Sequence, residues 1–103
     1  MFQLAAHRAL AELHVPFIEW LLLETLQELI DEKQDAVSQI EVATRAGLTR
    51  MVASYRMILM QEQGLVDGGP DSDGRAYRIY LSGLGQRTLR ACNERLEAAG
   101  LTG

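Results

Sequence analysis

Apolar residues return every three or four positions through the first third of the chain. This spacing, typical of the buried face of an α-helix, predicts helices over about residues 2–14 and 17–33. The second segment is apolar on more than one face, so we expect it at the centre of the core. Pro16 separates the two helices, because the residue before a proline is pushed out of the α region.

Two short helices follow, and each carries a polar cap at its start. Ser38 and Glu41 match the capping-box pattern, and Gly47 offers a left-handed end to the first helix. Thr49 can cap the second helix. Two short capped helices around a glycine-containing turn predict a helix-turn-helix over about residues 38–63.

The last third of the chain changes from strand to helix periodicity. Residues 65–82 hold two extended stretches around a cluster of glycine, proline, aspartate and serine, which predicts a β-hairpin, or wing. Ser82 can cap a final helix over about residues 83–99. The expected fold is one domain over residues 1–103, mainly α with a small β-hairpin. It is a winged helix-turn-helix with N- and C-terminal dimerisation helices.

Both terminal helices carry apolar seams that a domain of this size need not bury internally. A homodimer with twofold symmetry that interleaves the two seams is the economical interpretation. The alternative is that the helices only cover the core of their own chain. The residues expected at the dimer interface are Phe2, Ala6, Ala9, Leu13, Leu89, Cys92 and Leu96.

The composition is that of an ordinary globular protein, with 48% hydrophobic and 23% charged residues. No apolar run approaches the roughly 18 residues that cross a bilayer, and the first residues lack the pattern of a secretory signal. One cysteine excludes a disulfide framework, and Cys92, His7 and His14 are too few for a zinc cluster. We therefore expect a cytoplasmic protein with no membrane partner, metal or cofactor.

The sequence contains none of the usual patterns of an active site. It has no phosphate-binding glycine loop, no paired histidine and carboxylate cluster and no nucleophile with a base, so we expect no enzyme. The net charge of −4 is uneven, because acidic residues gather before residue 38 and every later basic residue is an arginine. This distribution permits a nucleic-acid surface in the second part of the chain.

The order of the elements, with five short motifs, resembles the MarR family of winged helix transcriptional regulators. The resemblance runs from about residue 17 to residue 89. It implies a sequence-specific regulator, expected to be a repressor, with the recognition helix 49–63 in the major groove of double-stranded DNA. The motifs lie at residues 38–43, 47–50, 64–66, 73–75 and 81–85. The motif at residues 73–75 is an Asp-x-Arg wing signature.

The resemblance assigns particular side chains to DNA. Arg50 can fork onto a guanine or hold a phosphate, and Met51 can contact thymine methyl groups. Arg75 would enter the minor groove, held in place by the wing-supporting Asp73. The alternatives are a solvated helix face for Arg50, a simple cap for Ser38 and a surface ion pair for Arg75. The expected DNA-binding residues are Ser38, Gln39, Thr49, Arg50, Met51, Ser54, Tyr55, Arg75 and Arg78.

The partners implied by the resemblance are a pseudo-palindromic DNA site, a second copy of the chain and a possible small aromatic effector. Candidate lining residues for the effector are His7, His14, Trp20 and Tyr55, although a lone tryptophan in an apolar helix belongs more often to a core. Cys92 is expected to be buried and unreactive. The alternative function is a winged helix module for protein contact, which an exposed patch at Ile58 and Leu59 would favour.

Overall fold

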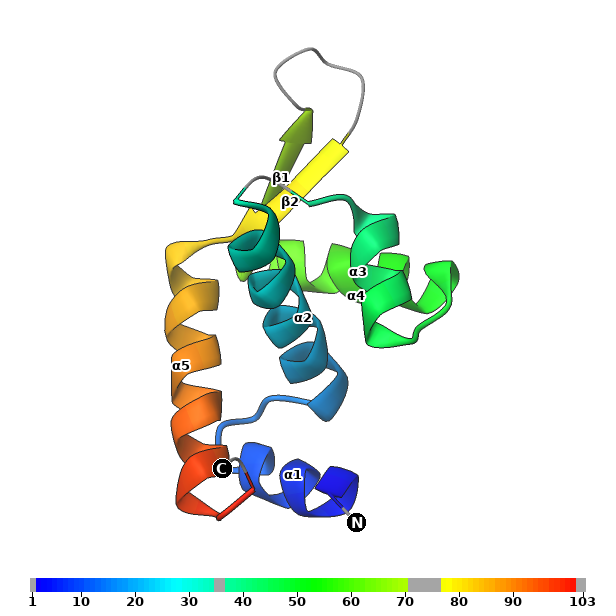
Figure 1. The fold of residues 1–103 in the computed structure, drawn as a ribbon. Helices are drawn as coiled ribbons and strands as arrows, with labels where there is room; N and C mark the ends of the chain where they lie inside the picture. Colours follow the sequence, from blue (N-terminus) through cyan, green and yellow to red (C-terminus); the bar gives the residue numbers. More distant parts are fainter. Residues whose placement is uncertain (1, 35–36, 71–76, 102–103) are drawn as a thin grey trace.

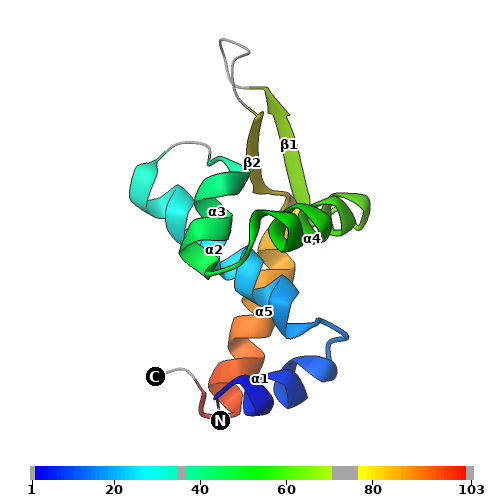
Figure 2. The ribbon, with the colours of Figure 1, turned by 90° about the vertical axis from the view of Figure 1, so that its right-hand side faces the viewer.

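The computed structural model describes residues 2–34, 37–70 and 77–101. Helices α1, α5 and α2 form an elongated body, and α3, α4 and the hairpin lie at one end of it (Figures 1 and 2). The described elements, in chain order, are α1 Phe2–Ala11, α2 Phe17–Lys33, α3 Gln39–Ala46, α4 Arg50–Glu62, β1 Val66–Pro70, β2 Tyr77–Leu81 and α5 Gly83–Ala98. The predicted mainly α fold with a small β-hairpin is confirmed.

Helix α2 lies at the centre of the molecule, as its apolar pattern predicted. It packs against α1, α3, α4, α5 and β2. Its bounds agree with the predicted ones, and Gln34 ends it in the left-handed region with φ of 57°. Helix α1 ends at Ala11, earlier than expected, because residues 12–14 form a turn in which His14 has a φ of 57°. The side chains of α2 that are fully buried are Leu22, Leu23 and Leu26.

The capping residues predicted for the helix-turn-helix are all in place. Ser38 Oγ accepts a hydrogen bond of 3.3 Å from the backbone N–H of Glu41, whose carboxylate accepts one from the N–H of Ser38. Gly47 ends α3 with φ of 73°, a conformation that glycine adopts without steric cost. Thr49 Oγ1 accepts from the N–H of Val52 at 3.2 Å and starts α4. These caps position α3 and α4 across a short turn.

The hairpin pairs β1 and β2 in antiparallel register, with Val66 opposite Leu81 and Gly68 opposite Ile79. The segment before α3 joins the same sheet. The N–H of Ile79 donates a hydrogen bond of 2.8 Å to the carbonyl oxygen of Val37, in an isolated β-bridge. The hairpin is therefore tied to the helix-turn-helix through its backbone.

A single serine connects the end of α4, the hairpin and the start of α5. Ser82 Oγ accepts a hydrogen bond of 2.9 Å from the N–H of Gly85 and donates one of 2.5 Å to the carbonyl oxygen of Gly64. The backbone at Gly85 lies close to Leu65, so a Cβ there would stand 2.0 Å from the Leu65 carbonyl oxygen. The first turn of α5 is thus fixed against the last residues before β1.

The terminal helices pack on each other within one chain, and the dimer interface expected for them stays a prediction. Helix α1 packs against α5 of the same chain, and the buried residues of both seams belong to one core cluster. Phe2 and Leu13 keep 42% and 38% of their surface exposed, and the Phe2 ring packs on Phe17 with centroids 6.3 Å apart. The periodicity identified the seams correctly but could not tell which surface covers them. The five expected interface residues that are buried in the core of their own chain are Ala6, Ala9, Leu89, Cys92 and Leu96.

Two expectations about absences can be compared only with the described part of the chain. None of its helices is both long and apolar enough to pass through a membrane. Within the same residues, His, Cys, Asp and Glu side chains form no group of three or more that could hold a metal ion.

Candidate nucleic-acid interface

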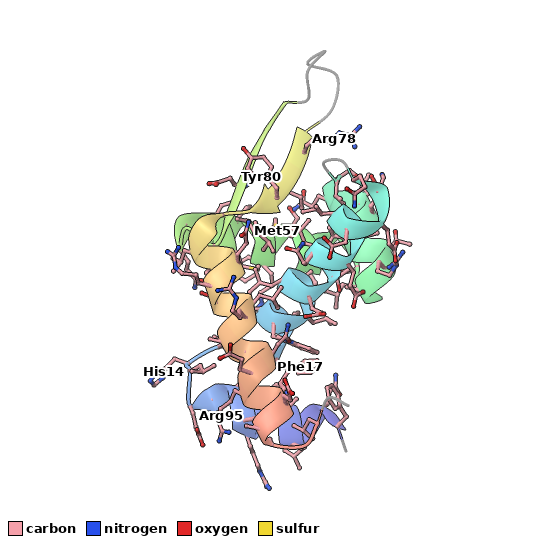
Figure 3. The ribbon with its side chains drawn as sticks, turned by 60° about the vertical axis from the view of Figure 1, so that its left-hand side comes forward. His14, Phe17, Met57, Arg78, Tyr80 and Arg95 are labelled. Atoms are coloured by element: carbon pink, nitrogen blue, oxygen red, sulfur yellow. The ribbon has the colours of Figure 1, made fainter. Side chains whose placement is uncertain are left out.

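The two faces of α4 differ sharply in burial. Ala53, Met57 and Met60 lie in the core, as their spacing predicted. Met57 points into the body of the molecule (Figure 3). The side chains on the opposite face, Met51, Tyr55 and Ile58, are 81%, 61% and 52% exposed. The helix therefore rests on the core along one side and presents a full face to solvent.

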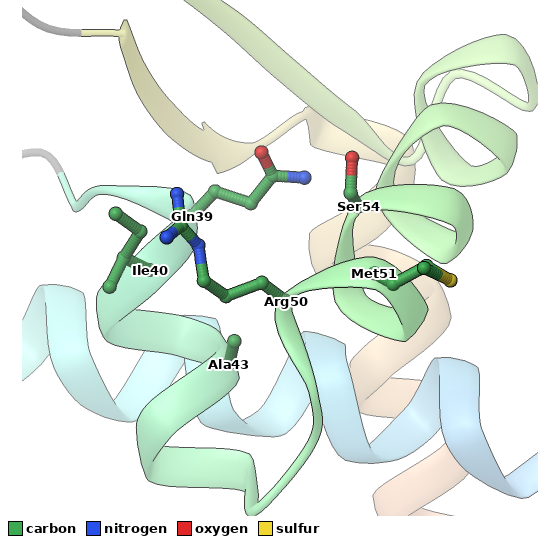
Figure 4. A pocket seen from close by; sticks show the side chains of 6 residues that line it. All are labelled: Gln39, Ile40, Ala43, Arg50, Met51 and Ser54. Atoms are coloured by element: carbon green, nitrogen blue, oxygen red, sulfur yellow. The ribbon is translucent and has the colours of Figure 1, made fainter.

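A surface hollow of about 290 Å³ lies between α3 and α4. In Figure 4 the Arg50 side chain runs from α4 toward the first turn of α3, beside Gln39 and Ile40, whereas Met51 points away from α3. The hollow brings four of the predicted DNA-binding residues together. We call it the α3–α4 hollow; it is lined by Gln39, Ile40, Ala43, Arg50, Met51 and Ser54.

Arg50 is the charged residue at the centre of this surface. It is exposed, and no residue in the ranges described forms an ion pair or hydrogen bond with its guanidinium. A guanidinium presents five N–H donors in a planar fork that matches a phosphate or the O6 and N7 edge of guanine. Arg50 is thus available to an anionic or guanine partner.

The first turn of α3 supplies the other side of the hollow. Its free backbone N–H groups and positive dipole end favour an anion. The Ser38 hydroxyl, however, is used locally, since it accepts from the N–H of Glu41 and donates to the Glu41 carboxylate at 3.0 Å. Gln39 extends its amide toward Ser54 across the hollow (Figure 4). Ser38 therefore acts as the cap, and Gln39 is the side chain presented outward.

Arg78 lies on β2 and contacts α3. Its Nη1 atom is 3.7 Å from Oε1 of Glu41, and the side chain is only partly exposed (Figure 3). Glu41 also accepts a hydrogen bond from Lys33, which holds the pKa of the Glu41 carboxyl below its usual range, together with Ser38. Arg78 therefore joins the hairpin to α3, a role that its place on an alternating strand did not reveal.

The two wing residues expected to reach the minor groove, Arg75 and Asp73, lie outside the described residues. Their predicted roles stay predictions.

A second hollow, of about 370 Å³, opens where the turn before α2 meets α4 and α5. Glu19, only 5% exposed, lines it, and in the described ranges its carboxylate has no hydrogen bond or ion pair. Arg56, also without such a partner there, lies on the α4 side. We call this the α2–α4 hollow; its lining residues are His14, Val15, Pro16, Glu19, Arg56, Leu59, Gln63, Leu65 and Thr88.

The candidate effector residues do not come together at this hollow. His14 lines it, but the Trp20 side chain is buried in the core, where its indole is bonded to Asn93. The His7 ring packs beside Phe17 with centroids 5.2 Å apart, and Tyr55 stands on the exposed face of α4. Three of the four predicted lining residues are thus placed elsewhere.

Cys92 is fully buried in the core. Burial, together with the nearby Glu19 charge, raises the pKa of its thiol to about 11. Since the thiolate is the reactive form, burial and the raised pKa both disfavour reaction of this cysteine in the folded chain.

Sequence reasoning missed some residues of these surfaces. Ile40 and Ala43 line the α3–α4 hollow, while Glu19 and Arg56 line the α2–α4 hollow. The spacing of Ile40 and Ala43 places them on one face of α3, and this signal could have identified them. Nothing in the sequence near Glu19 or Arg56 indicates that they line the same hollow.

The fold defined by these elements is a winged helix: a helix-turn-helix followed by an antiparallel hairpin and a closing helix. No protein-family model matches the chain, and no curated protein matches it either. Solved structures do match it over nearly its whole length. The transcriptional regulator MosR of M. tuberculosis, solved in complex with DNA, is 21% identical with a TM-score of 0.77, and the match covers 95% of this chain and 68% of that one.

Two further structures carry the same fold. CouR of Rhodococcus jostii RHA1, bound to p-coumaroyl-CoA, is 25% identical with a TM-score of 0.79, over 96% of this chain and 67% of that one. A MarR-family transcriptional regulator from Silicibacter pomeroyi is 18% identical with a TM-score of 0.76. The match covers 96% of this chain and 64% of that one. The chain has the fold of the MarR-family regulators, as its motifs predicted, and it spans about two thirds of the length of these proteins.

Proposed function

We propose that this chain is a sequence-specific regulator of transcription that binds double-stranded DNA. The observation that carries the proposal is the α3–α4 hollow, where Arg50 stands beside Gln39 and Ser54 on an exposed surface. A major groove about 12 Å wide accepts one α-helix, and α4 presents its first turns at the exposed end of the motif. Similarity to MosR, which was solved with DNA, supports the proposal.

The proposed mode of action is repression in the cytoplasm by a homodimer that occupies a pseudo-palindromic site. Two copies supply two recognition helices about one helical turn apart, which is the arrangement that helix-turn-helix proteins require for tight binding. Phe2, Leu4 and Leu13 remain exposed on and just after α1, so they are available to a second copy. The wing, with Arg75, is proposed for the adjacent minor groove.

Selection of bound sequences from a random duplex pool tests the proposal. We expect enrichment of a two-part site by the wild-type chain and loss of that enrichment by Arg50→Ala. Arg90→Ala is the matched control, because Arg90 is an exposed arginine of α5 far from the α3–α4 hollow. Equal recovery of sequences by all three proteins, with no motif, would remove the DNA-binding function and favour the protein-contact module.

A small aromatic effector is the second part of the proposal. The α2–α4 hollow combines apolar walls at Val15, Leu59 and Leu65 with Arg56 and His14, which can hold an acidic or phenolic group. The ligand-bound structure of CouR supports an effector for this fold. A thermal-shift panel of hydroxybenzoates and hydroxycinnamates tests it: a binder should raise the melting temperature of the wild type and of Arg90→Gln but not of Arg56→Gln. No shift with any compound would remove this part.

A further inference from the structure

The outermost line of α4 is apolar. Met51, Tyr55 and Ile58 are spaced by four and three residues, so they stand on one face of the helix, directly opposite the buried residues of α4. Large exposed apolar side chains in a row are unusual on a water-facing helix and mark a surface that a partner covers. We call Met51, Tyr55 and Ile58 the α4 stripe.

Three polar residues of the same helix lie to one side of the stripe, and Arg56 lies in the α2–α4 hollow on the other side. Arg50 and Ser54 line the α3–α4 hollow, and Gln61 lines a smaller hollow next to it, against β2. Residues 49–61 contain no acidic side chain, and α4 has its one carboxylate at Glu62, in the last turn. Over residues 49–61 the helix itself therefore carries none of the negative charges that would repel phosphates.

The chemistry of the major groove limits what an apolar stripe can read there. Each base edge offers hydrogen-bond donors and acceptors, and the one apolar group is the C5 methyl of thymine. Met51 and Ile58 are seven residues apart, which is roughly 10 Å along the helix, or about three base-pair steps. We propose that the α4 stripe contacts thymine methyl groups, so each half-site contains thymines within about three consecutive base pairs.

Charge and continuity favour DNA over a protein as the occupant of the stripe. The stripe adjoins the α3–α4 hollow through Met51, which belongs to both surfaces, and Arg50 stands one residue away. A duplex that places a phosphate or guanine at Arg50 brings its base edges onto the stripe in the same approach. This inference rests on the proposed DNA binding, and the test below separates the two.

The test replaces thymine by deoxyuridine, which keeps every hydrogen-bonding group of the base and lacks only the C5 methyl. A duplex recovered by selection is synthesised with each thymine of the half-site replaced in turn, and affinity is measured by fluorescence anisotropy at one salt concentration. We expect the affinity to fall about three- to five-fold when at least one of the thymines is replaced. This is the loss expected when one methyl-sized group is no longer buried. Replacement of thymines outside the two half-sites should leave the affinity unchanged.

Variants connect the effect to the stripe. In Met51→Ala or Ile58→Ala, the difference in affinity between the thymine and deoxyuridine duplexes should disappear at one position. The unfolding midpoint should stay unchanged, because both side chains are exposed. Leu84→Ala is the matched control, since Leu84 is an exposed leucine of α5 outside the stripe, and it should keep the full difference.

The outcomes are distinguishable. If a specific duplex binds equally with thymine and deoxyuridine at every position, or if both variants keep the difference, the stripe does not read methyl groups and the proposed function stands. A selected half-site without thymine overturns the inference in the same way. If no sequence is enriched by the wild-type chain, the proposed function and this inference are both overturned.

Discussion

The indole N–H of Trp20 donates a hydrogen bond of 2.9 Å to Oδ1 of Asn93, a residue 73 positions later in the chain. The amide of Asn93 in turn donates to Oε2 of Glu24 at 3.0 Å. One asparagine thus joins two turns of α2 to the middle of α5. This polar chain fixes the long closing helix against the centre of the core.

Asn93→Ala should therefore destabilise the chain. The substitution leaves the Trp20 N–H without its partner, and an unsatisfied buried donor costs about 1–3 kcal/mol. Urea unfolding followed by tryptophan fluorescence measures the effect. Glu94→Ala, at an exposed neighbouring position, serves as the control and should stay within about 0.5 kcal/mol of the wild type. Equal midpoints for the two variants would mean that the bond contributes nothing.

Gly85→Ala should destabilise the folded chain and Gly83→Ala should stabilise it, although both positions lie in the first turn of α5. At Gly85 a Cβ would meet the Leu65 carbonyl oxygen at 2.0 Å, so the backbone must shift at a cost of about 1–3 kcal/mol. At Gly83 the nearest atom is the movable end of Arg87 at 3.4 Å, and alanine gains helix propensity. Thermal unfolding of the two variants compares them; a stable Gly85→Ala would contradict the close approach.

Acid should weaken the contact between α2, α3 and the hairpin. The hydrogen bond from Lys33 lowers the pKa of Glu41 below its usual 4.5, so the stabilisation is complete above that pH and is lost as the pH falls through the lower folded-state value. Arg95 and Arg45 lower the pKa values of Glu12 and Glu32 in the same direction. Glu41→Gln should flatten part of the decline in melting temperature between about pH 5 and 3, whereas Glu94→Gln should not.

Arg50→Gln should show which group on the duplex Arg50 contacts. If it holds a phosphate, the slope of log affinity against log salt becomes shallower by about one for each Arg50 engaged, and all sequences weaken alike. If it forks onto guanine, the slope stays and the preference at one base pair is lost, by about 1–3 kcal/mol. Titrations at several salt concentrations separate the two results. An unchanged slope together with an unchanged preference would remove Arg50 from the interface.

Cys92 should resist alkylation in the folded chain. Its thiol is buried and, with a pKa of about 11, protonated at neutral pH, so iodoacetamide should modify it only after unfolding. Mass spectrometry after timed labelling at about pH 7.5, with and without urea, measures this. Rapid labelling without urea would contradict the expectation that the thiol is buried and unreactive.

The helix starts were predictable because the information for them is local. Ser38, Thr49 and Ser82 each cap the N–H three residues later, and these contacts depend on a short stretch of sequence. The same holds for Gly47, whose left-handed conformation ends α3. The buried side of α4 followed from its spacing, since one face of a helix must meet the core.

What the sequence could not supply is the identity of the partner across each contact. The seams that contain Ala9 and Leu96 look the same whether they meet in one chain or between two, and the structure closes them within one. Arg78 meets Glu41 across 37 positions, a contact that no local pattern encodes. Four residues of the α3–α4 hollow were predicted individually, but its shape required both helices in place.

The carbonyl of Val37 and the N–H of Ile79 hold the hairpin arm to the chain entering the helix-turn-helix, and Arg78 adds a second tie through Glu41. These two attachments join the base of the hairpin to the start of the helix-turn-helix. The position of the hairpin base relative to the helix-turn-helix is therefore set when the chain folds. If two copies bind DNA together as proposed, differently spaced half-sites would be met by a change in how the copies sit relative to each other.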